Sequence, residues 1–246
     1  MWNKLRNSFG SSVTPVCNVC GSHNFESFRT RENARCSACS SMERTRILQL
    51  ILDREKILKH GQKVFHLAPE AGIGRNIKKI VGAGYEAFDL NPKIYASDLN
   101  VQKFDLITDS QKLPSDKYDL VVHCHVMEHV PCDIVSVMWH LHRSLKKTGK
   151  HIFCVPIMKG NYAADFGKLS QEDKAARFGQ FDHVRRFGRE DFDLMLGMAF
   201  NLKPYFLTDA LAEKMKMHRI PEGAAASLDS NTFFILEKND LKLRGV

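Results

Sequence analysis

The segment 63–130 constrains the fold more than any other part of the chain, because it alternates short apolar strands with a helix. A strand at 63–67 is followed by a glycine-bearing turn, a helix and a second strand that ends in an acid, Asp89. A further strand at 118–124 runs into polar residues that include His125. In parallel sheets, ligands bind where strand carboxyl ends meet helix amino ends. The pattern therefore predicts an enzyme that holds an adenosine-type cofactor at this edge.

Apolar segments elsewhere complete the predicted sheet and its covering helices. The predicted strands are 63–67, 85–88, 103–107, 118–124, 151–155, 202–207 and 232–236, and the helices are 71–80, 133–146 and 189–198. The sequence thus predicts an α/β fold, a Rossmann-like, seven-stranded, mostly parallel sheet with helices on both faces, preceded by a small zinc ribbon. The first turn lacks the G-x-G-x-x-G pattern of dinucleotide-binding dehydrogenases, which disfavours that class.

The zinc ribbon is predicted from four cysteines near the start of the chain. Cys17, Cys20, Cys36 and Cys39 form a C-x2-C-x15-C-x2-C pattern, which is the spacing of a four-cysteine zinc site. Two disulfides are the alternative, and a reducing compartment disfavours them. Four protein ligands close the coordination sphere of zinc, so the predicted site is structural and not catalytic.

These motifs divide the chain into predicted parts. They are a flexible N-terminal tail at 1–12, the zinc ribbon at 13–40, a linking helix at 41–60 and the main domain at 61–246. Ser40 and Glu43 have the spacing of a capping box, which predicts the start of the linking helix. The apolar face of that helix is expected to continue to about Leu58.

Two further motifs carry a family resemblance. The first motif, at 113–122 and 125–131, reads L-P-S-D-K-Y-D-L-V-V and then H-V-M-E-H-V-P, and it is similar to an LP…(F/Y)DLV…HVLEHV segment. The second motif, L-K-K-T-G-K at 145–150, is similar to an L-K-P-G-G turn. Over about residues 61–238 the chain resembles the class I S-adenosylmethionine (SAM) dependent methyltransferases. With its ribbon it resembles type 11-like members that carry an N-terminal four-cysteine zinc site.

The resemblance implies SAM as cofactor, with contacts along the carboxyl edge of the sheet. Most members carry an acid in the first strand, whereas His66 stands in that place here. Glu70 is expected to take over the contact with the cofactor's ammonium group; alternatively, the altered turn supports binding without catalysis. The implied contacts with the methionine part of SAM are His66, Ala68, Pro69, Glu70 and Gly72, and those with ribose are Asp89 and Leu90. Adenine is expected beside Asp105 and Leu106, with Asp109 as a rival. The residues expected beneath the sulfonium are His123, Cys124 and His125.

Histidines are the candidates for a general base, because the reference pKa of their side chain lies near 6.5. The candidate catalytic residues are His125, His129 and His183, and for each of them a structural role is an equal alternative. Residues 125–129 also match H-x-x-E-H, the inverted zinc-peptidase motif. That motif needs both histidines on one helix, which the nearby Pro131 disfavours. Arg185 and Arg186 could clamp an anionic acceptor or lie on a solvated face.

Composition leaves two classes of methyl acceptor open. The formal charge of +8 and the pI of about 9.1 suit nucleic acid or acidic substrates. The favoured expectation is a small polar acceptor, an oxygen of a sugar or surface-polysaccharide precursor, as the resemblance implies. The alternative is an RNA methyltransferase whose ribbon contacts RNA. No segment reaches the roughly 18 apolar residues of a membrane span and no apolar leader is present, so a cytoplasmic location is expected. The oligomeric state is not predicted.

Overall fold

A single mixed sheet forms the centre of the structure. The computed structural model describes residues 14–243, so the predicted tail at 1–12 lies outside the described residues. The seven strands have the order β11-β12-β7-β6-β3-β4-β5. They are β3 (Val64–Leu67), β4 (Tyr85–Asp89), β5 (Gln102–Lys103), β6 (Tyr118–Cys124), β7 (Leu145–Cys154), β11 (Pro204–Tyr205) and β12 (Phe233–Glu237). Neighbours from β5 to β7 are parallel, whereas β12 and β11 add antiparallel pairs at one edge.

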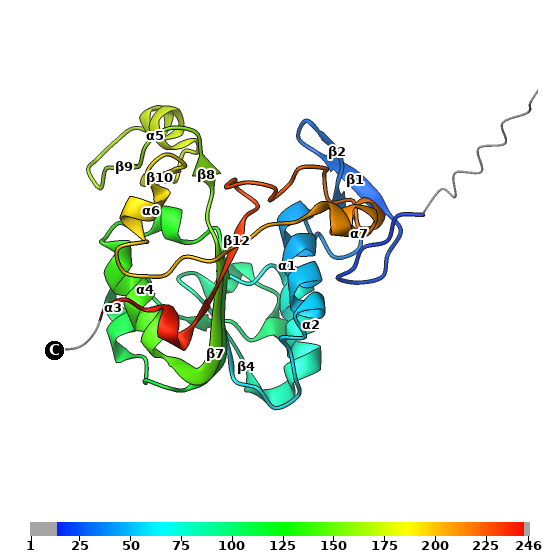
Figure 1. The fold of residues 1–246 in the computed structure, drawn as a ribbon, viewed down its shortest axis with the longest axis horizontal. Coiled ribbons are helices and arrows are strands. Elements are labelled where there is room, and N and C mark those ends of the chain that lie inside the picture. Colours follow the sequence, from blue (N-terminus) through cyan, green and yellow to red (C-terminus); the bar gives the residue numbers. More distant parts are fainter. Residues whose placement is uncertain (1–13, 244–246) are drawn as a thin grey trace, which may run out of the picture.

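Helices cover both faces of this sheet (Figure 1). One face carries α1 (Glu43–Arg54) and α2 (Ala71–Val81), and the other carries α3 (Leu106–Asp109) and α4 (Ile134–Arg143). Successive strand residues point to opposite faces. Leu120 and Val122 therefore join the core under α1 and α2, while Val121 joins the core under α4. This arrangement confirms the predicted Rossmann-like α/β fold.

The strand order reverses between β3 and β6. The chain builds outward from β3 through β4 and β5, and it then returns to the other side of β3 at β6. Carboxyl ends of strands diverge at such a reversal, and the crevice between them is the usual ligand site of an open α/β sheet. The topology thus places a crevice beside the ends of β3 and β6.

Several predicted element boundaries are wrong, and the reasons are local. The predicted strand 103–107 ends after Lys103, because the Asp105 side chain accepts a hydrogen bond from the Ile107 amide (2.9 Å) and caps α3. The predicted helix 189–198 shrinks to α6 (Phe192–Met195). Gly149 does not end a helix but lies within β7, where a Cβ would stand 2.7 Å from the Tyr118 carbonyl oxygen. Strand β7 therefore begins earlier than predicted.

The linking helix also differs from its prediction at both ends. Helix α1 begins at Glu43 after the N-cap residue Met42, so Ser40 does not form the predicted capping box. Ser40 instead adopts a left-handed conformation with φ of 59°. The helix ends at Arg54 and not near Leu58, because Lys56 is also left-handed, with φ of 49°.

The N-terminal ribbon is tied to the rest of the protein by one buried arginine. The ribbon contains the antiparallel pair β1 (Phe25–Phe28) and β2 (Arg31–Cys36), which lies beside α7 (Ala212–Met217) in Figure 1. The Arg46 guanidinium is fully buried. It donates to the backbone carbonyl oxygens of Ala34 (3.0 Å) and Ser41 (2.7 Å) in the ribbon region and to those of His218 (2.7 Å) and Arg219 (2.9 Å) after α7.

An insertion between β7 and β11 forms a separate small sheet. Its strands are β8 (Ile157–Met158), β9 (Ala163–Ala164) and β10 (Arg185–Gly188), in the order β8-β10-β9, with α5 (Gln171–Phe178) alongside. Arg185 is buried and donates to the backbone carbonyl oxygens of Val130 and Cys132. Arg186 donates to the Asn161 carbonyl oxygen. Neither arginine is therefore placed as the anion clamp that the sequence left open. Within residues 14–243, no helix is long and apolar enough to cross a membrane.

Candidate functional site

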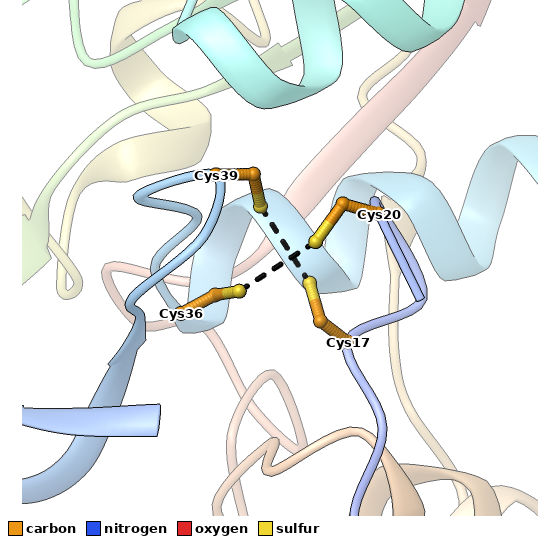
Figure 2. A group of neighbouring side chains, drawn as sticks. All are labelled: Cys17, Cys20, Cys36 and Cys39. Carbon is orange, nitrogen blue, oxygen red and sulfur yellow. Dashed lines mark hydrogen bonds between the residues drawn. The ribbon is translucent and has the colours of Figure 1, made fainter. Parts of the chain in front are cut away.

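The four cysteines of the predicted zinc site converge in the structure (Figure 2). The Sγ atoms of Cys17 and Cys39 are 3.7 Å apart, those of Cys20 and Cys36 are 3.6 Å apart, and all four lie within 4.8 Å of one another. Thiolates around a tetrahedral zinc ion, each at ~2.3 Å, are separated by about 3.8 Å, whereas disulfide sulfurs are about 2.05 Å apart. The cysteine cluster fits a small zinc ribbon and not a pair of disulfides. The hydrogen bond between Cys17 and Cys39 lowers the pKa of the Cys17 thiol and raises that of Cys39, so one sulfur of this pair is a thiolate before the other.

Gly72 and Glu70, which were predicted to contact the cofactor, instead contact the ribbon and α1. Gly72 packs against the cysteine cluster, since a Cβ on it would lie 3.0 Å from the Cys39 carbonyl oxygen and 3.2 Å from the Cys39 Sγ. The Glu70 carboxylate accepts hydrogen bonds from Arg44 Nε (2.8 Å) and from the Thr45 hydroxyl. The glycine-bearing turn thus serves as a docking point for the ribbon region.

A cavity of about 430 Å³ opens at the carboxyl edge of the sheet, where the strand order reverses. Predicted cofactor residues that line it are Ala68, Asp89, Leu90, Asp105, Leu106 and His125. Further lining residues are Leu67, Ile94, Phe104, Ile107, Val126, His129, Val130, Pro131 and Asp182. Its volume falls within the range of about 300–1,000 Å³ that small-molecule sites occupy. We call it the edge cavity.

Asp89 is held in one orientation at the mouth of the edge cavity. One carboxylate oxygen accepts a hydrogen bond from the Asn91 amide (2.7 Å), and the other accepts one from the Tyr95 hydroxyl (2.8 Å). A carboxylate has about four lone-pair sites, so two remain for hydroxyl donors. The carboxylate of Asp89 can therefore accept two hydrogen bonds from a vicinal diol such as ribose.

Part of the lining of the edge cavity is apolar. Leu90, Ile94 and Ile107 are large hydrophobic residues, and they are 62%, 70% and 45% exposed. Exposed apolar side chains around a concavity mark a binding surface for a flat or apolar ligand group. Asp105 lies beside them, whereas its rival Asp109 lies outside the cavity and pairs with Lys112 (2.6 Å).

The other predicted cofactor residues do not line the edge cavity. His66 is buried within β3 and its Nδ1 lies 3.0 Å from the Tyr85 hydroxyl, and His123 is buried within β6 against the His151 ring. Burial lowers the pKa of both imidazoles to about 3, so they are neutral core residues. Cys124 belongs to a separate cluster with His125 and Cys154, and Pro69 is buried.

A second cavity of about 480 Å³ adjoins the first, because His125 and His129 line both. It is bounded by the turn after β6, by α1, by the insertion between β7 and β11 and by Ser230 ahead of β12. Its lining residues are Arg44, His125, Glu128, His129, Pro156, Met158, Phe178, Gly179, Gln180, His183 and Ser230. All three histidines that were predicted as catalytic therefore gather here. We call it the histidine cavity.

The H-x-x-E-H residues do not form a peptidase helix. His125 has φ of 54°, which no helix allows, and Met127–His129 is a single short turn. His125 Nδ1 lies 3.3 Å from Glu128 Oε1, and its Nε2 lies 3.0 Å from the Ser230 carbonyl oxygen. Burial opposes the charged imidazole, but the Glu128 carboxylate outweighs it and raises the pKa of His125. The geometry excludes the inverted zinc-peptidase arrangement.

Sequence reasoning missed residues that reach these cavities from distant elements. Arg44 comes from α1 and is positioned by Glu70, and Ser230 precedes β12. Tyr95, which orients Asp89, stands six positions after it and carries no motif. Arg44 follows Glu43 in the linking helix, but only the fold shows that Arg44 lines the histidine cavity.

Comparison with known proteins gives fold-level likenesses. No protein-family model and no curated protein matches the chain. Among solved structures, the chain is similar to a SAM-dependent methyltransferase from Mesorhizobium loti (17% identity, TM-score 0.49, covering 76% of this chain and 94% of that one). It is similar to a SAM-dependent methyltransferase from Archaeoglobus fulgidus (14%, TM-score 0.48, 78% and 92%). It is also similar to phosphoethanolamine N-methyltransferase 2 from Haemonchus contortus, in complex with phosphomonomethylethanolamine and S-adenosylhomocysteine (17%, TM-score 0.47, 76% and 51%).

Proposed function

We propose that this protein is a SAM-dependent methyltransferase that holds SAM in the edge cavity and a small polar acceptor in the histidine cavity. The observation that carries the proposal is that the two cavities meet at His125 and His129, next to the reversal of strand order. A donor and an acceptor must approach each other in line for methyl transfer. Two adjoining cavities with a shared wall provide that approach.

The edge cavity offers a suitable partner for each part of SAM. Asp89 has two free lone-pair sites for the ribose hydroxyls, and Asp105 stands beside the apolar side chains of Ile94 and Ile107, which would enclose adenine. Ala68 and His125 line the part of the cavity that the sulfonium and methionine would occupy. SAM supplies an electrophilic methyl group when bound, so the protein mainly has to align the reactants.

The histidine cavity suits a polar acceptor. Its wall combines the Arg44 guanidinium with the His125, His129 and His183 imidazoles, all of which can bind hydroxyl or acidic groups. Methylation of an acceptor hydroxyl forms an O–C bond and breaks the S–C bond, giving S-adenosylhomocysteine and releasing the hydroxyl proton. We assign the acceptor to the class of sugars or polysaccharide precursors. A general-base role for one of the histidines stays a prediction.

The ribbon has a structural role in this proposal. A zinc ion bound by Cys17, Cys20, Cys36 and Cys39 would fix the ribbon against Gly72 and thereby the start of α2. The ribbon region would in turn position α1, whose Arg44 lines the histidine cavity. The ribbon thus contributes to the acceptor site through packing.

RNA is the second candidate acceptor, and one observation favours it. The guanidinium groups of Arg29, Arg31 and Arg35 surround the Phe28 ring at 5.5 to 5.8 Å on the ribbon. Such a basic and aromatic surface can contact single-stranded nucleic acid. However, Arg31 and Arg35 are paired with carboxylates, at 2.8 Å and 2.6 Å. This pairing leaves little net charge for phosphates, so we favour the small acceptor.

Cofactor binding is tested by calorimetry with S-adenosylhomocysteine. Asp89→Asn should weaken binding by about 10- to 100-fold, because it removes a charge-assisted hydrogen bond to ribose. Asp109→Asn is the matched control, since that aspartate lies outside the edge cavity, and it should bind as the natural protein does. Equal affinity of the two variants would refute the assignment of Asp89.

The acceptor class is tested by transfer of a labelled methyl group from SAM. Free sugars, nucleotide sugars and bulk RNA are offered in parallel, and we expect label in a sugar fraction. Label in RNA alone would favour the second candidate. No transfer to any fraction, together with no binding of S-adenosylhomocysteine, would overturn the proposed function.

A further inference from the structure

Three side chains with metal-binding atoms meet in the wall of the histidine cavity, far from the cysteine cluster in the chain. One ligand atom from each of Glu128, His129 and His183 lies within 4.8 Å of the other two. Glu128 and His129 belong to the turn after β6, and His183 comes from the insertion that precedes β10. The amide of Val184 donates to the Glu128 carbonyl oxygen (2.9 Å), which holds the two segments together. We call these residues the Glu-His-His cluster.

The carboxylate of Glu128 is buried without the partners that such a group requires. The residue is fully buried, and neither carboxylate oxygen has a hydrogen-bond partner among residues 14–243. Taking an ionised carboxylate out of water is strongly unfavourable unless it is paired or coordinates a metal. His125 Nδ1 is near one oxygen, at 3.3 Å, and His129 Nε2 is 4.0 Å from the same oxygen. Oε2 of Glu128 has no hydrogen-bond partner among the described residues, so its lone pairs remain open to a further cation beside the His125 imidazole.

Both histidines of the cluster are oriented as metal ligands usually are. His183 Nδ1 lies 3.1 Å from the Phe178 carbonyl oxygen, and His129 Nδ1 lies 3.3 Å from the Asp182 carbonyl oxygen. A carbonyl can only accept, so each Nδ1 carries the proton and each Nε2 keeps a free lone pair. Metal-binding histidines almost always donate their second N–H in this way, which fixes the ring and its tautomer.

We propose that Glu128, His129 and His183 bind one divalent first-row transition-metal ion. Two imidazoles and one carboxylate suit Mn²⁺, Fe²⁺, Co²⁺ or Zn²⁺ better than Mg²⁺ or Ca²⁺, which prefer all-oxygen sites. Three protein ligands leave positions open for exchangeable ligands, unlike the four cysteines of the ribbon. Because the cluster lines the histidine cavity, the open positions lie on the side where a small molecule can enter.

The metal also has a chemical use that rests on the proposed function. An acceptor hydroxyl bound at an open position would lose its proton more readily, because the cation stabilises the alkoxide. The proton passes to solvent, the alkoxide oxygen forms the new O–C bond, and the S–C bond of SAM breaks to leave S-adenosylhomocysteine. Metal binding itself does not depend on this role.

A Co²⁺ titration of the full chain tests the site. The ribbon is first filled with zinc and one zinc per chain is verified by metal analysis, so that Co²⁺ reports on the second site. We expect one Co²⁺ to bind per chain, with visible d–d absorption and without the intense near-ultraviolet bands of cobalt thiolates. His129→Ala and His183→Ala should each weaken Co²⁺ binding at least about tenfold. His60→Ala is the matched control at an exposed histidine and should bind as the natural protein does.

The outcomes separate this inference from the proposed function. Absence of Co²⁺ binding, binding only with thiolate bands, or unchanged affinity in both cluster variants would overturn the metal site, and would mean that the His125 imidazole alone balances Glu128. Because His129 is partly exposed, its variant remains informative if His183→Ala fails to fold. Co²⁺ binding without methyl transfer would support the site and count against the proposed function. Methyl transfer without Co²⁺ binding would support the proposed function and count against the metal site.

Discussion

The cysteine cluster and the Glu-His-His cluster both gather potential metal ligands within 4.8 Å, but the chain assembles them in different ways. The cysteines come from two close pairs within one small ribbon. The second cluster joins a turn after a central strand to an insertion more than fifty positions later. The first is therefore visible in the sequence as a spacing, whereas the second exists only once the sheet and the insertion have folded.

The two clusters also differ in what their geometry permits. Four thiolates complete the coordination of zinc and leave no place for a substrate, so that site can only stabilise. Two histidines and a glutamate leave coordination positions open beside a cavity of about 480 Å³. A coordination sphere closed by four cysteines and an open one that lines a cavity indicate a division between stability and chemistry.

Removing one cysteine is the strongest test of this division. Cys36→Ser should abolish zinc binding to the ribbon, with loss of metal-binding free energy on the order of 10 kcal/mol. The thermal unfolding temperature should fall sharply, while Cys132→Ser, outside the cysteine cluster, should keep one zinc. Metal analysis and calorimetric melting check both. A Cys36→Ser protein that is folded and holds as many zinc ions per chain as the natural protein would contradict the ribbon.

The next largest effect is expected at Arg46, which links the ribbon to the segment after α7. Arg46→Ala leaves several buried carbonyl oxygens without a donor, so the free energy of unfolding should fall by at least about 3 kcal/mol. Arg35→Ala, in the same ribbon, removes a half-exposed pair with Glu26 and an exposed contact with the Phe28 ring, and it should cost less than Arg46→Ala, at about 1 kcal/mol. Urea unfolding measures both. Similar losses in the two variants would show that the ribbon is not held by Arg46.

Elements specified by neighbouring residues could be predicted from the sequence. Strand β6 has the bounds that its apolar run predicts, and each of the seven strands of the sheet overlaps a predicted segment. The position of Asp89 at the end of β4 follows from the same local pattern. These features depend on periodicity and spacing, which the sequence displays directly.

Features that depend on packing between distant segments could not be predicted. The sequence predicts Gly72 as part of a cofactor-binding turn, but in the structure its missing side chain makes room for Cys39. Glu70 reads as a cofactor ligand, but Arg44 and Thr45 of α1 occupy its carboxylate. The competing partner lies in the ribbon for Gly72 and in α1 for Glu70, and no local pattern states which partner a side chain will meet.

The buried histidines of the sheet provide a pH test that is independent of the clusters. Burial lowers the pKa of His66 and His123 to about 3, and that of their neighbour His151 well below its ordinary value. Above pH 6.5 these histidines are neutral in both the folded and the unfolded protein, so they do not lower the free energy of unfolding. As pH falls from about 6.5 towards 3, the unfolded chain gains protons that the folded protein excludes. The free energy of unfolding should therefore fall by up to about 1.4 kcal/mol per pH unit for each histidine.

Urea unfolding between pH 7 and 5 checks this slope. The zinc content at each pH separates it from proton competition at the thiolates. His123→Leu removes one titrating group and should flatten the slope by up to about 1.4 kcal/mol per pH unit. An unchanged slope in that variant would show that His123 does not resist protonation. The Tyr85 hydroxyl lies near His66, and the His142 ring lies near His151.

The smallest expected effect is also the one that shows how tightly the ribbon and α2 are joined. A Cβ added in Gly72→Ala would press on the carbonyl oxygen and Sγ of Cys39, which bound zinc would hold in place, so the substitution should cost about 1–2 kcal/mol. Gly167→Ala is the control, because its Cβ would meet a single side-chain oxygen, that of Asp165 at 3.0 Å, and no part of the cysteine cluster. In the Cys36→Ser background the ribbon can give way, and the cost of Gly72→Ala should largely disappear. A double-mutant cycle by urea unfolding measures this coupling. Additive effects would mean that the cysteine cluster and α2 are in contact without being energetically coupled. The ribbon would then not influence the edge cavity through this contact.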